Sequence, residues 1–141
     1  MNELRIKSQE RLLAFGIRPS LPRVEVMKYL LEHHTHPNVD TIYKDLLVKI
    51  PSLSKTTVYN TVQNLSDKGA VLRITIDNKN VCYDGNAEPH PHFLCKKCGK
   101  IYDLKISQEI DIKLDTCEHL IQEVSLYYTG ICKDCLDKMS K

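Results

Sequence analysis

Four of the six cysteines in this 141-residue chain form two C-x-x-C pairs, Cys95/Cys98 and Cys132/Cys135. The 33 residues from 99 to 131 separate the two pairs. Together the pairs supply four thiolates, the set that closes a tetrahedral zinc site. A redox dithiol, or thiols that only fill a small core, would explain a single pair, but two pairs favour structural zinc. We therefore expect a zinc ion that stabilises the fold and catalyses nothing, because no coordination position stays open.

Composition and charge exclude several classes of protein. Hydrophobic residues make up 42% and charged residues 27% of the chain, which excludes long disorder. No apolar run approaches the roughly 20 residues that span a bilayer, and the first residues lack the apolar core of a signal peptide, so we expect a cytoplasmic protein without a membrane partner. The net charge is +2, with +3 on residues 1–69 (10 − 7) and −1 on residues 70–141 (10 − 11). An acidic partner is therefore expected at the first half.

The first half of the chain is predicted to contain four helices followed by a β-hairpin. Apolar residues at three- and four-residue spacing predict helices over residues 3–15, 21–33, 39–49 and 55–68. Serines precede the second and fourth helices as N-caps, and glycines end the first and fourth, namely Ser20, Ser54, Gly16 and Gly69. β-branched and apolar residues flank a turn cluster at 77–80, which predicts a hairpin over residues 70–83. Helices followed closely by a hairpin are the order of elements in a winged helix.

The second half is predicted to be a small α+β unit after a linker at 85–89. Its expected strands and helices are 93–95, 100–104, 107–119 (helix), 123–129 and 133–139 (helix). A unit of this size buries little surface and is expected to need a metal, a partner chain or both. We therefore expect an α+β protein with a winged-helix domain over 1–84, a hinge at 85–89 and a second domain over 90–141.

Histidines and aspartates gather around the linker and the first cysteine pair. His90 and His92 alternate in an extended segment, so both imidazoles are expected on one side. Asp84 precedes the linker, and Asp103 returns close to His92 if its strand pairs antiparallel across the knuckle. Imidazole and carboxylate together suit ferrous iron, manganese or zinc. Taken singly, these residues could equally be solvated surface side chains, and spacing alone leaves both interpretations open.

The fourth predicted helix has the composition of a DNA-recognition helix. Val58, Val62 and Leu65 form its buried stripe at positions i, i+4 and i+7. The opposite face presents Lys55, Thr56, Tyr59, Asn60 and Gln63. Amides of this kind can hydrogen-bond base edges in the major groove, while Lys55, together with Arg23 of the second helix, suits phosphates. A face that is merely solvated would normally have more Glu and Lys, so the pattern favours DNA binding.

Four short motifs spread over the chain match those of one known family. They are His36-Pro37, Thr57-Val58-Tyr59-Asn60, His90-x-His92-x-x-Cys95-x-x-Cys98-Gly99-x-Ile101-x-Asp103 and Gly130-Ile131-Cys132-x-x-Cys135. In these motifs the chain resembles the Fur family of bacterial metal-dependent repressors. The resemblance implies a winged-helix DNA-binding domain joined to an α+β dimerisation domain, a homodimer that binds a double-stranded DNA operator, and no enzymatic activity.

Within that family the chain most resembles the peroxide-sensing (PerR) branch. Members of that branch hold a ferrous or manganous ion with three His and two Asp, in addition to the structural zinc. Carried over by position, these ligands fall on His36, Asp84, His90, His92 and Asp103. Aspartate at 103 favours this branch, because the iron-sensing branch usually has Glu there. One regulatory ion and one zinc are therefore expected in each subunit.

The resemblance also implies how the regulator would respond. One ion bound by side chains from both halves would fix their relative orientation for DNA binding. Peroxide would react at ferrous iron and oxidise a ligand imidazole, with His36 and His90 as candidates, so that metal and DNA are released. Peroxide is the only small-molecule substrate expected.

Three other functions compete with this interpretation. The first is an iron-, manganese- or zinc-responsive repressor of the same family that does not respond to peroxide. The second is a metallohydrolase that uses the His/Asp set, although no general base is evident beside it. The third is a zinc-stabilised interaction module without a DNA role.

Overall fold

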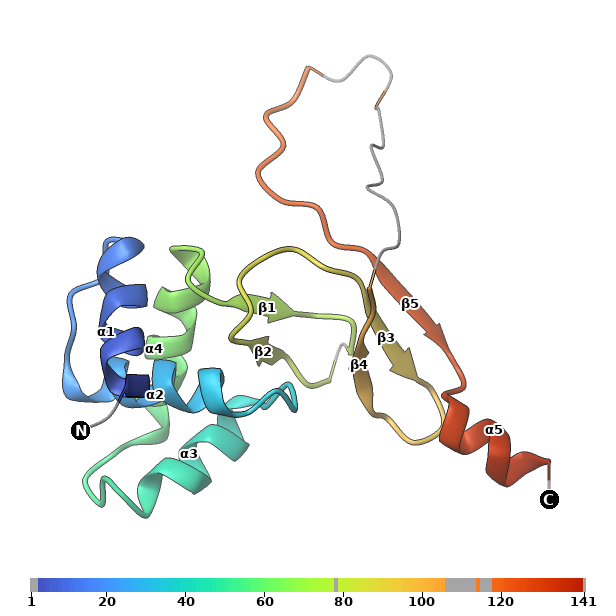
Figure 1. Ribbon diagram of the computed structural model, residues 1–141, viewed down its shortest axis with the longest axis horizontal. Coiled ribbons are helices and arrows are strands. Elements are labelled where there is room, and N and C mark those ends of the chain that lie inside the picture. The colour runs from blue at the N-terminus through green and yellow to red at the C-terminus, as the bar shows by residue number, and fades with distance from the viewer. Residues whose placement is uncertain (1–2, 78, 106–113, 115–117, 141) are drawn as a thin grey trace. The chain divides into compact units, whose positions relative to one another are not determined.

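The computed structural model describes residues 3–77, 79–105, 114 and 118–140 (Figure 1). The chain forms two compact units, Met1–Glu88 and Pro89–Lys141. The division between them falls inside the predicted linker. None of the helices formed by the described residues is long and apolar enough to cross a membrane.

The first unit has the predicted order of four helices and a hairpin. Its elements are α1 (Glu3–Ala14), α2 (Leu21–Glu32), α3 (Val39–Leu47), α4 (Lys55–Asp67), β1 (Leu72–Ile74) and β2 (Cys82–Asp84). The two strands pair antiparallel, with Arg73 opposite Tyr83. This arrangement confirms the predicted winged-helix order, with shorter strands than the sequence suggested.

Serine caps mark the start of two helices of this unit, and a glycine marks the end of one of them. The Ser20 hydroxyl accepts from the Arg23 amide at the start of α2, and Ser54 accepts from the Thr57 amide at the start of α4. Both serine caps were predicted. Gly69 ends α4 with a φ of +86°, the left-handed conformation that favours glycine.

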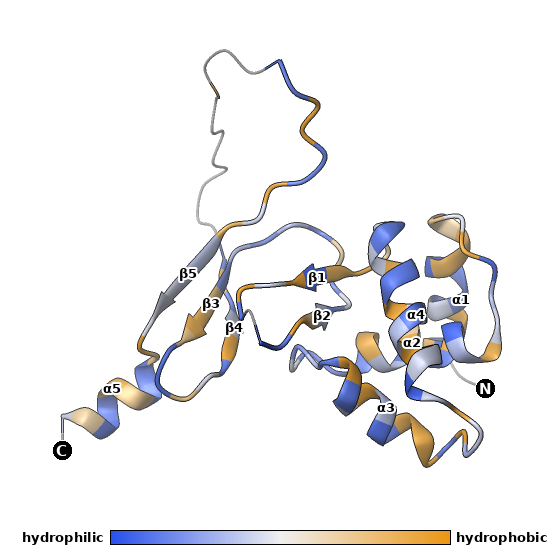
Figure 2. Ribbon diagram, turned by 180° about the vertical axis from the view of Figure 1, so that it is seen from behind, coloured by the Kyte–Doolittle hydropathy of each residue, from blue (hydrophilic) through white to orange (hydrophobic). Residues whose placement is uncertain are grey.

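One apolar core holds the four helices and the hairpin together. Its fully buried members come from every helix: Leu12, Val26, Met27, Leu30, Ile42, Val58, Val62 and Leu65. Apolar and polar residues are mixed around these helices, as expected of helices with one buried face (Figure 2). The predicted inner stripe of α4 is confirmed, and its opposite face is left for binding.

The second unit is a three-stranded sheet with a short helix. Its elements are β3 (His92–Cys95), β4 (Ile101–Asp103), β5 (Tyr127–Gly130) and α5 (Lys133–Met139). The strand order is β4-β3-β5, with β4 antiparallel and β5 parallel to β3. The mixture of helices and small sheets confirms the α+β class.

Two predictions for the second unit differ from the structure or fall outside it. The strand expected over 123–129 begins only at Tyr127. Tyr127 pairs with His92, which is the first residue of β3, so the residues before Tyr127 have no partner in that strand. Val124 is 70% exposed and lies outside the sheet. Most of the helix expected over 107–119, namely residues 107–113 and 115–117, lies outside the described residues.

Candidate metal sites and nucleic-acid interface

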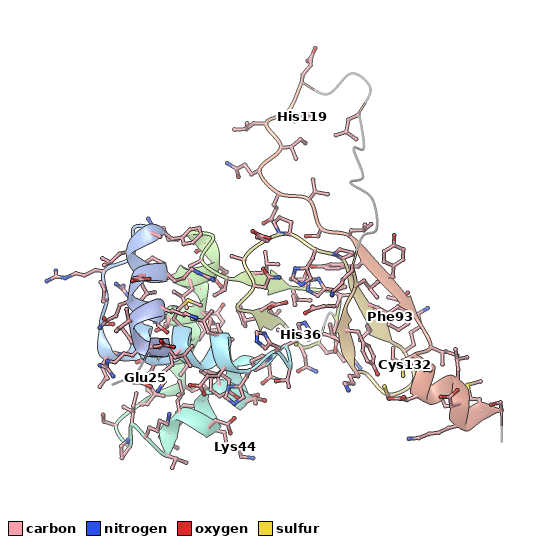
Figure 3. The ribbon with its side chains drawn as sticks, viewed as in Figure 1. Glu25, His36, Lys44, Phe93, His119 and Cys132 are labelled. Carbon is pink, nitrogen blue, oxygen red and sulfur yellow. The ribbon has the colours of Figure 1, made fainter. Side chains whose placement is uncertain are left out.

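The four paired cysteines converge on one point of the second unit. Cys95 ends β3, Cys98 lies in the following turn, and Cys135 lies in the first turn of α5. Cys132 is the N-cap residue of α5 (Figure 3). All four sulfur atoms lie within 4.8 Å of one another. Two pairs, Cys95–Cys135 and Cys98–Cys132, have sulfurs 3.8 Å apart. A tetrahedral zinc with Zn–S bonds of about 2.3 Å requires sulfur separations of about 3.8 Å, so the four thiols fit this ion.

Backbone amides stabilise the thiolate form of one of these cysteines, which is the form that binds a cation. The Cys95 sulfur accepts hydrogen bonds from the amides of Cys98 and Cys132, at 3.4 and 3.3 Å. These donors lower the pKa of the Cys95 thiol to about 6. The hydrogen bond to Cys132, together with burial, raises the pKa of Cys135 to about 12. Four adjacent thiols cannot all ionise beside one another without a positive charge, and a divalent cation would supply it.

His36 and Asp84 form a buried pair in the first unit. The His36 Nε2 lies 3.5 Å from the Asp84 Oδ2, and both side chains are less than 5% exposed. His36 lies in the loop between α2 and α3 (Figure 3), and the Tyr83 amide fastens that loop to β2 by donating to the Pro37 carbonyl at 3.0 Å. The second Asp84 oxygen accepts from the Asn86 amide at 2.9 Å, so the carboxylate is held from both sides.

The backbone of His36 has an unusual conformation. Its φ is +57°, and no other described non-glycine residue has a positive φ. This conformation costs energy for a side chain with a Cβ, and such strain is typically kept where a side chain must be aimed. Here it directs a buried imidazole at a buried carboxylate. The strain was not predicted from the sequence.

His90, His92 and Asp103 form the corresponding group in the second unit. Antiparallel pairing of β3 and β4 puts Asp103 opposite His92, as predicted. The same Asp103 oxygen lies 3.0 Å from the His90 Nε2 and 3.3 Å from the His92 Nε2. The two imidazole centroids are 4.3 Å apart, which confirms that both rings share one side. Metal bonds of about 2.1 Å at right angles bring two donors to about 3.0 Å, so this spacing suits a shared ion.

The five predicted ligands of the regulatory ion therefore fall into two groups. Two donors belong to the first unit and three to the second, all nitrogen and oxygen. Such donors suit ferrous iron, manganese or zinc better than a thiophilic ion. Neither group alone fills a coordination sphere of four to six. Their assignment as ligands of one ion stays a prediction.

The outer face of α4 presents most of the residues predicted to contact DNA. Lys55, Thr56, Tyr59 and Asn60 are exposed, Tyr59 by 54%, and Gln63 is half-buried with its amide donating to Asp67. Lys55 forms an ion pair with Asp40 on α3. The exposed aromatic and polar side chains suit contact with base edges.

A groove of about 490 Å³ runs between this face and the hairpin. Lys55, Thr56, Tyr59 and Gln63 line one side. Arg73 and Lys79 of the hairpin, neither predicted as a contact, line the other. Arg73 is the middle residue of β1 and lies opposite Tyr83 of β2, so its place in the groove depends on strand pairing, which no local sequence pattern indicates.

Arg23, predicted to contact phosphate, does not line this groove. It lies in the first turn of α2, and its guanidinium donates to the Arg18 carbonyl at 2.9 Å. This bond stabilises the turn before α2. The role of Arg23 as a DNA contact stays a prediction.

Comparison with known proteins agrees with this pair of features, a winged helix and clustered metal donors. The model of the Ferric uptake regulator family matches residues 14–128. The chain belongs to this family. Its members are metal-dependent, DNA-binding regulators of transcription, so the chain is a regulator and not an enzyme. The metallohydrolase alternative is therefore wrong.

Individual relatives narrow the comparison. The peroxide-responsive repressor PerR of Staphylococcus epidermidis is 34% identical over 131 residues, which cover 87% of this chain and 84% of the relative. The peroxide stress regulator of Campylobacter jejuni is 30% identical, with a TM-score of 0.64 and coverage of 96% of this chain and 100% of that one. A zinc uptake regulator solved with zinc and DNA shares the fold, with 15% identity, a TM-score of 0.69 and coverage of 99% and 97%.

Proposed function

We propose that this Fur-family regulator is a repressor that senses hydrogen peroxide through oxidation of a histidine ligand. The observation that supports it best is the pair of His/Asp groups, one in each unit and joined by the 85–89 linker. The similarity to peroxide-responsive regulators, which extends over most of the chain, supports the same signal.

In this proposal the two groups bind one regulatory ion. His36 and Asp84 hold it from the first unit, and His90, His92 and Asp103 hold it from the second. Binding of one ion by all five donors would require a single relative orientation of the two units. The bound ion would therefore restrict the linker to the conformations that allow this orientation. Shifting a population from 1:99 to 99:1 requires a preference of about 5.5 kcal/mol, which several metal–ligand bonds can provide. In that orientation the α4 faces of a dimer would meet successive major-groove faces of an operator.

The four cysteines have a separate role in this proposal. They bind one zinc in each subunit, which holds β3, the following turn and α5 together. The second unit also exposes Leu120, Ile121 and Val124, by 85%, 50% and 70%. Exposed apolar side chains of this kind suit burial against a second copy of the chain. We therefore propose a cytoplasmic homodimer, and sedimentation analysis of the zinc-loaded protein is expected to give twice the chain mass.

His36 and His90 are the proposed targets of oxidation. Ferrous iron held by these donors would supply the one-electron chemistry that cleaves the O–O bond of peroxide beside the ligand rings. In the overall reaction one peroxide oxygen would be added to an imidazole, which loses two electrons, and the other oxygen would leave as water. His36 is buried and conformationally restrained, and His90 is held against Asp103, so either ring stays in place while it reacts. An oxidised imidazole is a poor ligand, so the remaining donors lose the ion and the units lose their fixed orientation.

Peroxide treatment of iron-loaded and manganese-loaded protein tests this function. We expect iron-loaded protein to lose DNA binding and to gain one oxygen on the peptide that contains His36 or His90, as measured by fluorescence anisotropy and mass spectrometry. Manganese-loaded protein is expected to keep both its DNA affinity and its mass, because manganous ion is a poorer reductant of peroxide. If iron-loaded protein binds DNA but does not respond to peroxide, the alternative of a metal-responsive repressor insensitive to peroxide is correct.

A further inference from the structure

We propose that Arg73 of the hairpin binds a DNA phosphate in the groove beside α4, and that the buried Tyr83 positions it. This inference rests on the DNA-binding function proposed above. It adds to the interface a cation that lies outside the helix–turn–helix residues, and it assigns a role to a tyrosine that is 2% exposed.

The groove has the charge and lining that a nucleic-acid backbone requires. Lys55, Arg73 and Lys79 contribute three positive charges to its walls, and Asp40 contributes one negative charge. Tyr59 and Gln63 come from the exposed side of α4, the face expected to meet base edges. If the bases of a DNA duplex face α4, the phosphates of one DNA strand therefore lie between that helix and the hairpin.

The cations of the groove are not equivalent. Lys55 is in an ion pair with Asp40, so a phosphate must compete with a carboxylate for its charge. Arg73 instead lies directly opposite Tyr83 in the strand pairing, and both residues line the groove, so its neighbour there is neutral and leaves the positive charge for a ligand. The Arg73 guanidinium has five N–H donors, so a bond to the tyrosine hydroxyl would still leave a fork for two phosphate oxygens.

Strand pairing accounts for the contact between Arg73 and Tyr83. The two residues are direct partners in the antiparallel register, so their side chains leave the same face of the hairpin. Arg73 is exposed, whereas the Tyr83 ring belongs to the apolar core of the unit. The Tyr83 ring, fixed in the core, is thus the direct cross-strand neighbour of the exposed arginine in the lining of the groove.

Tyr83 is next to Asp84 in the sequence, so a variant of Tyr83 must be checked for its effect on the proposed metal ligands. The Tyr83 amide donates to the Pro37 carbonyl, and Asp84 is the next residue. A change in the backbone at Tyr83 could therefore disturb the metal ligands. The variant Tyr83→Phe removes only the hydroxyl, and its manganese affinity is expected to equal that of wild type.

Salt dependence of DNA binding tests the role of Arg73. The probe is a 30-base-pair random-sequence duplex, titrated with manganese-loaded full-length protein at several salt concentrations. Loss of one phosphate contact reduces the slope of log affinity against log salt by about 0.9 and weakens binding about tenfold near 0.1 M salt. We expect this result for Arg73→Gln. Arg73→Lys keeps the charge and is expected to keep the slope, while Tyr83→Phe is expected to weaken binding by a smaller factor.

Lys44→Gln is the matched control, because it removes one exposed positive charge from α3 outside the groove (Figure 3). It is expected to leave the slope unchanged. Equal slopes for Arg73→Gln, Lys44→Gln and wild type would overturn the role of Arg73 while leaving DNA binding intact. Wild-type protein that binds no duplex would instead overturn the proposed function. Arg73 is exposed, and unchanged thermal midpoints of both arginine variants would show that folding is not the cause.

Discussion

Serine in place of Cys98 is expected to release the zinc and unfold the second unit, while the first unit stays folded. Among the described residues of the second unit, the buried apolar cluster consists of Cys95, Cys132 and Cys135, with Phe93 and Tyr102 packed against it. Zinc binding contributes on the order of 10–16 kcal/mol to folding in small zinc domains, which is comparable to the whole stability of an ordinary domain. Cys98 is itself exposed, so its removal acts through the metal and not through lost packing.

Hydrogen exchange of the full chain, followed by mass spectrometry, measures this loss. Amides of β3 and β5 are expected to become unprotected in Cys98→Ser, whereas amides of α2 and α4 keep their protection. Cys82→Ser is the matched control, because Cys82 is 8% exposed in the first unit and lies outside the cluster. It should retain one zinc per chain. A Cys98→Ser protein with wild-type zinc content and wild-type exchange in β3 would contradict the assignment.

The parts of the fold that depend on short-range chemistry were predictable. Ser20 and Ser54 cap the helices that the sequence assigns to them, because a cap involves residues only three apart. The same holds for His92 and Asp103, whose register follows from the C-x-x-C turn between their strands. The strand predicted over 123–129 was too long because propensity says nothing about the length of the partner strand.

The two groups of candidate ligands differ in how far residues alone could predict them. His90, His92 and Asp103 lie close in sequence, and period-two alternation brings them together. His36 and Asp84 are far apart in the sequence, because α3, α4 and β1 lie between them. Their pairing depends on the folded core, and only the family resemblance connected them. The positive φ of His36 and the contact of Arg73 with Tyr83 are tertiary features that no local pattern predicts.

Alanine in place of His36 is expected to abolish metal-dependent DNA binding while leaving the zinc site and the dimer intact. His36 is one of only two proposed donors from the first unit, so without it the ion no longer ties that unit to the second. Changes in residues that merely support a metal ligand cost 10–100-fold in affinity, so loss of a ligand is expected to exceed about 100-fold for manganese. Competition titration of manganese and anisotropy of labelled duplex DNA measure the two effects.

Two further variants separate the imidazole from the strained backbone that presents it. Asparagine adopts positive φ more readily than most residues, so His36→Asn keeps the loop conformation and removes the ring. It is expected to lose metal-dependent DNA binding as His36→Ala does, but with a smaller loss of thermal stability. His34→Ala, at an exposed position in the same loop, should leave manganese affinity unchanged. If His36→Ala binds manganese and DNA as tightly as His34→Ala, the ion does not join the two units through His36, and another donor must supply that connection.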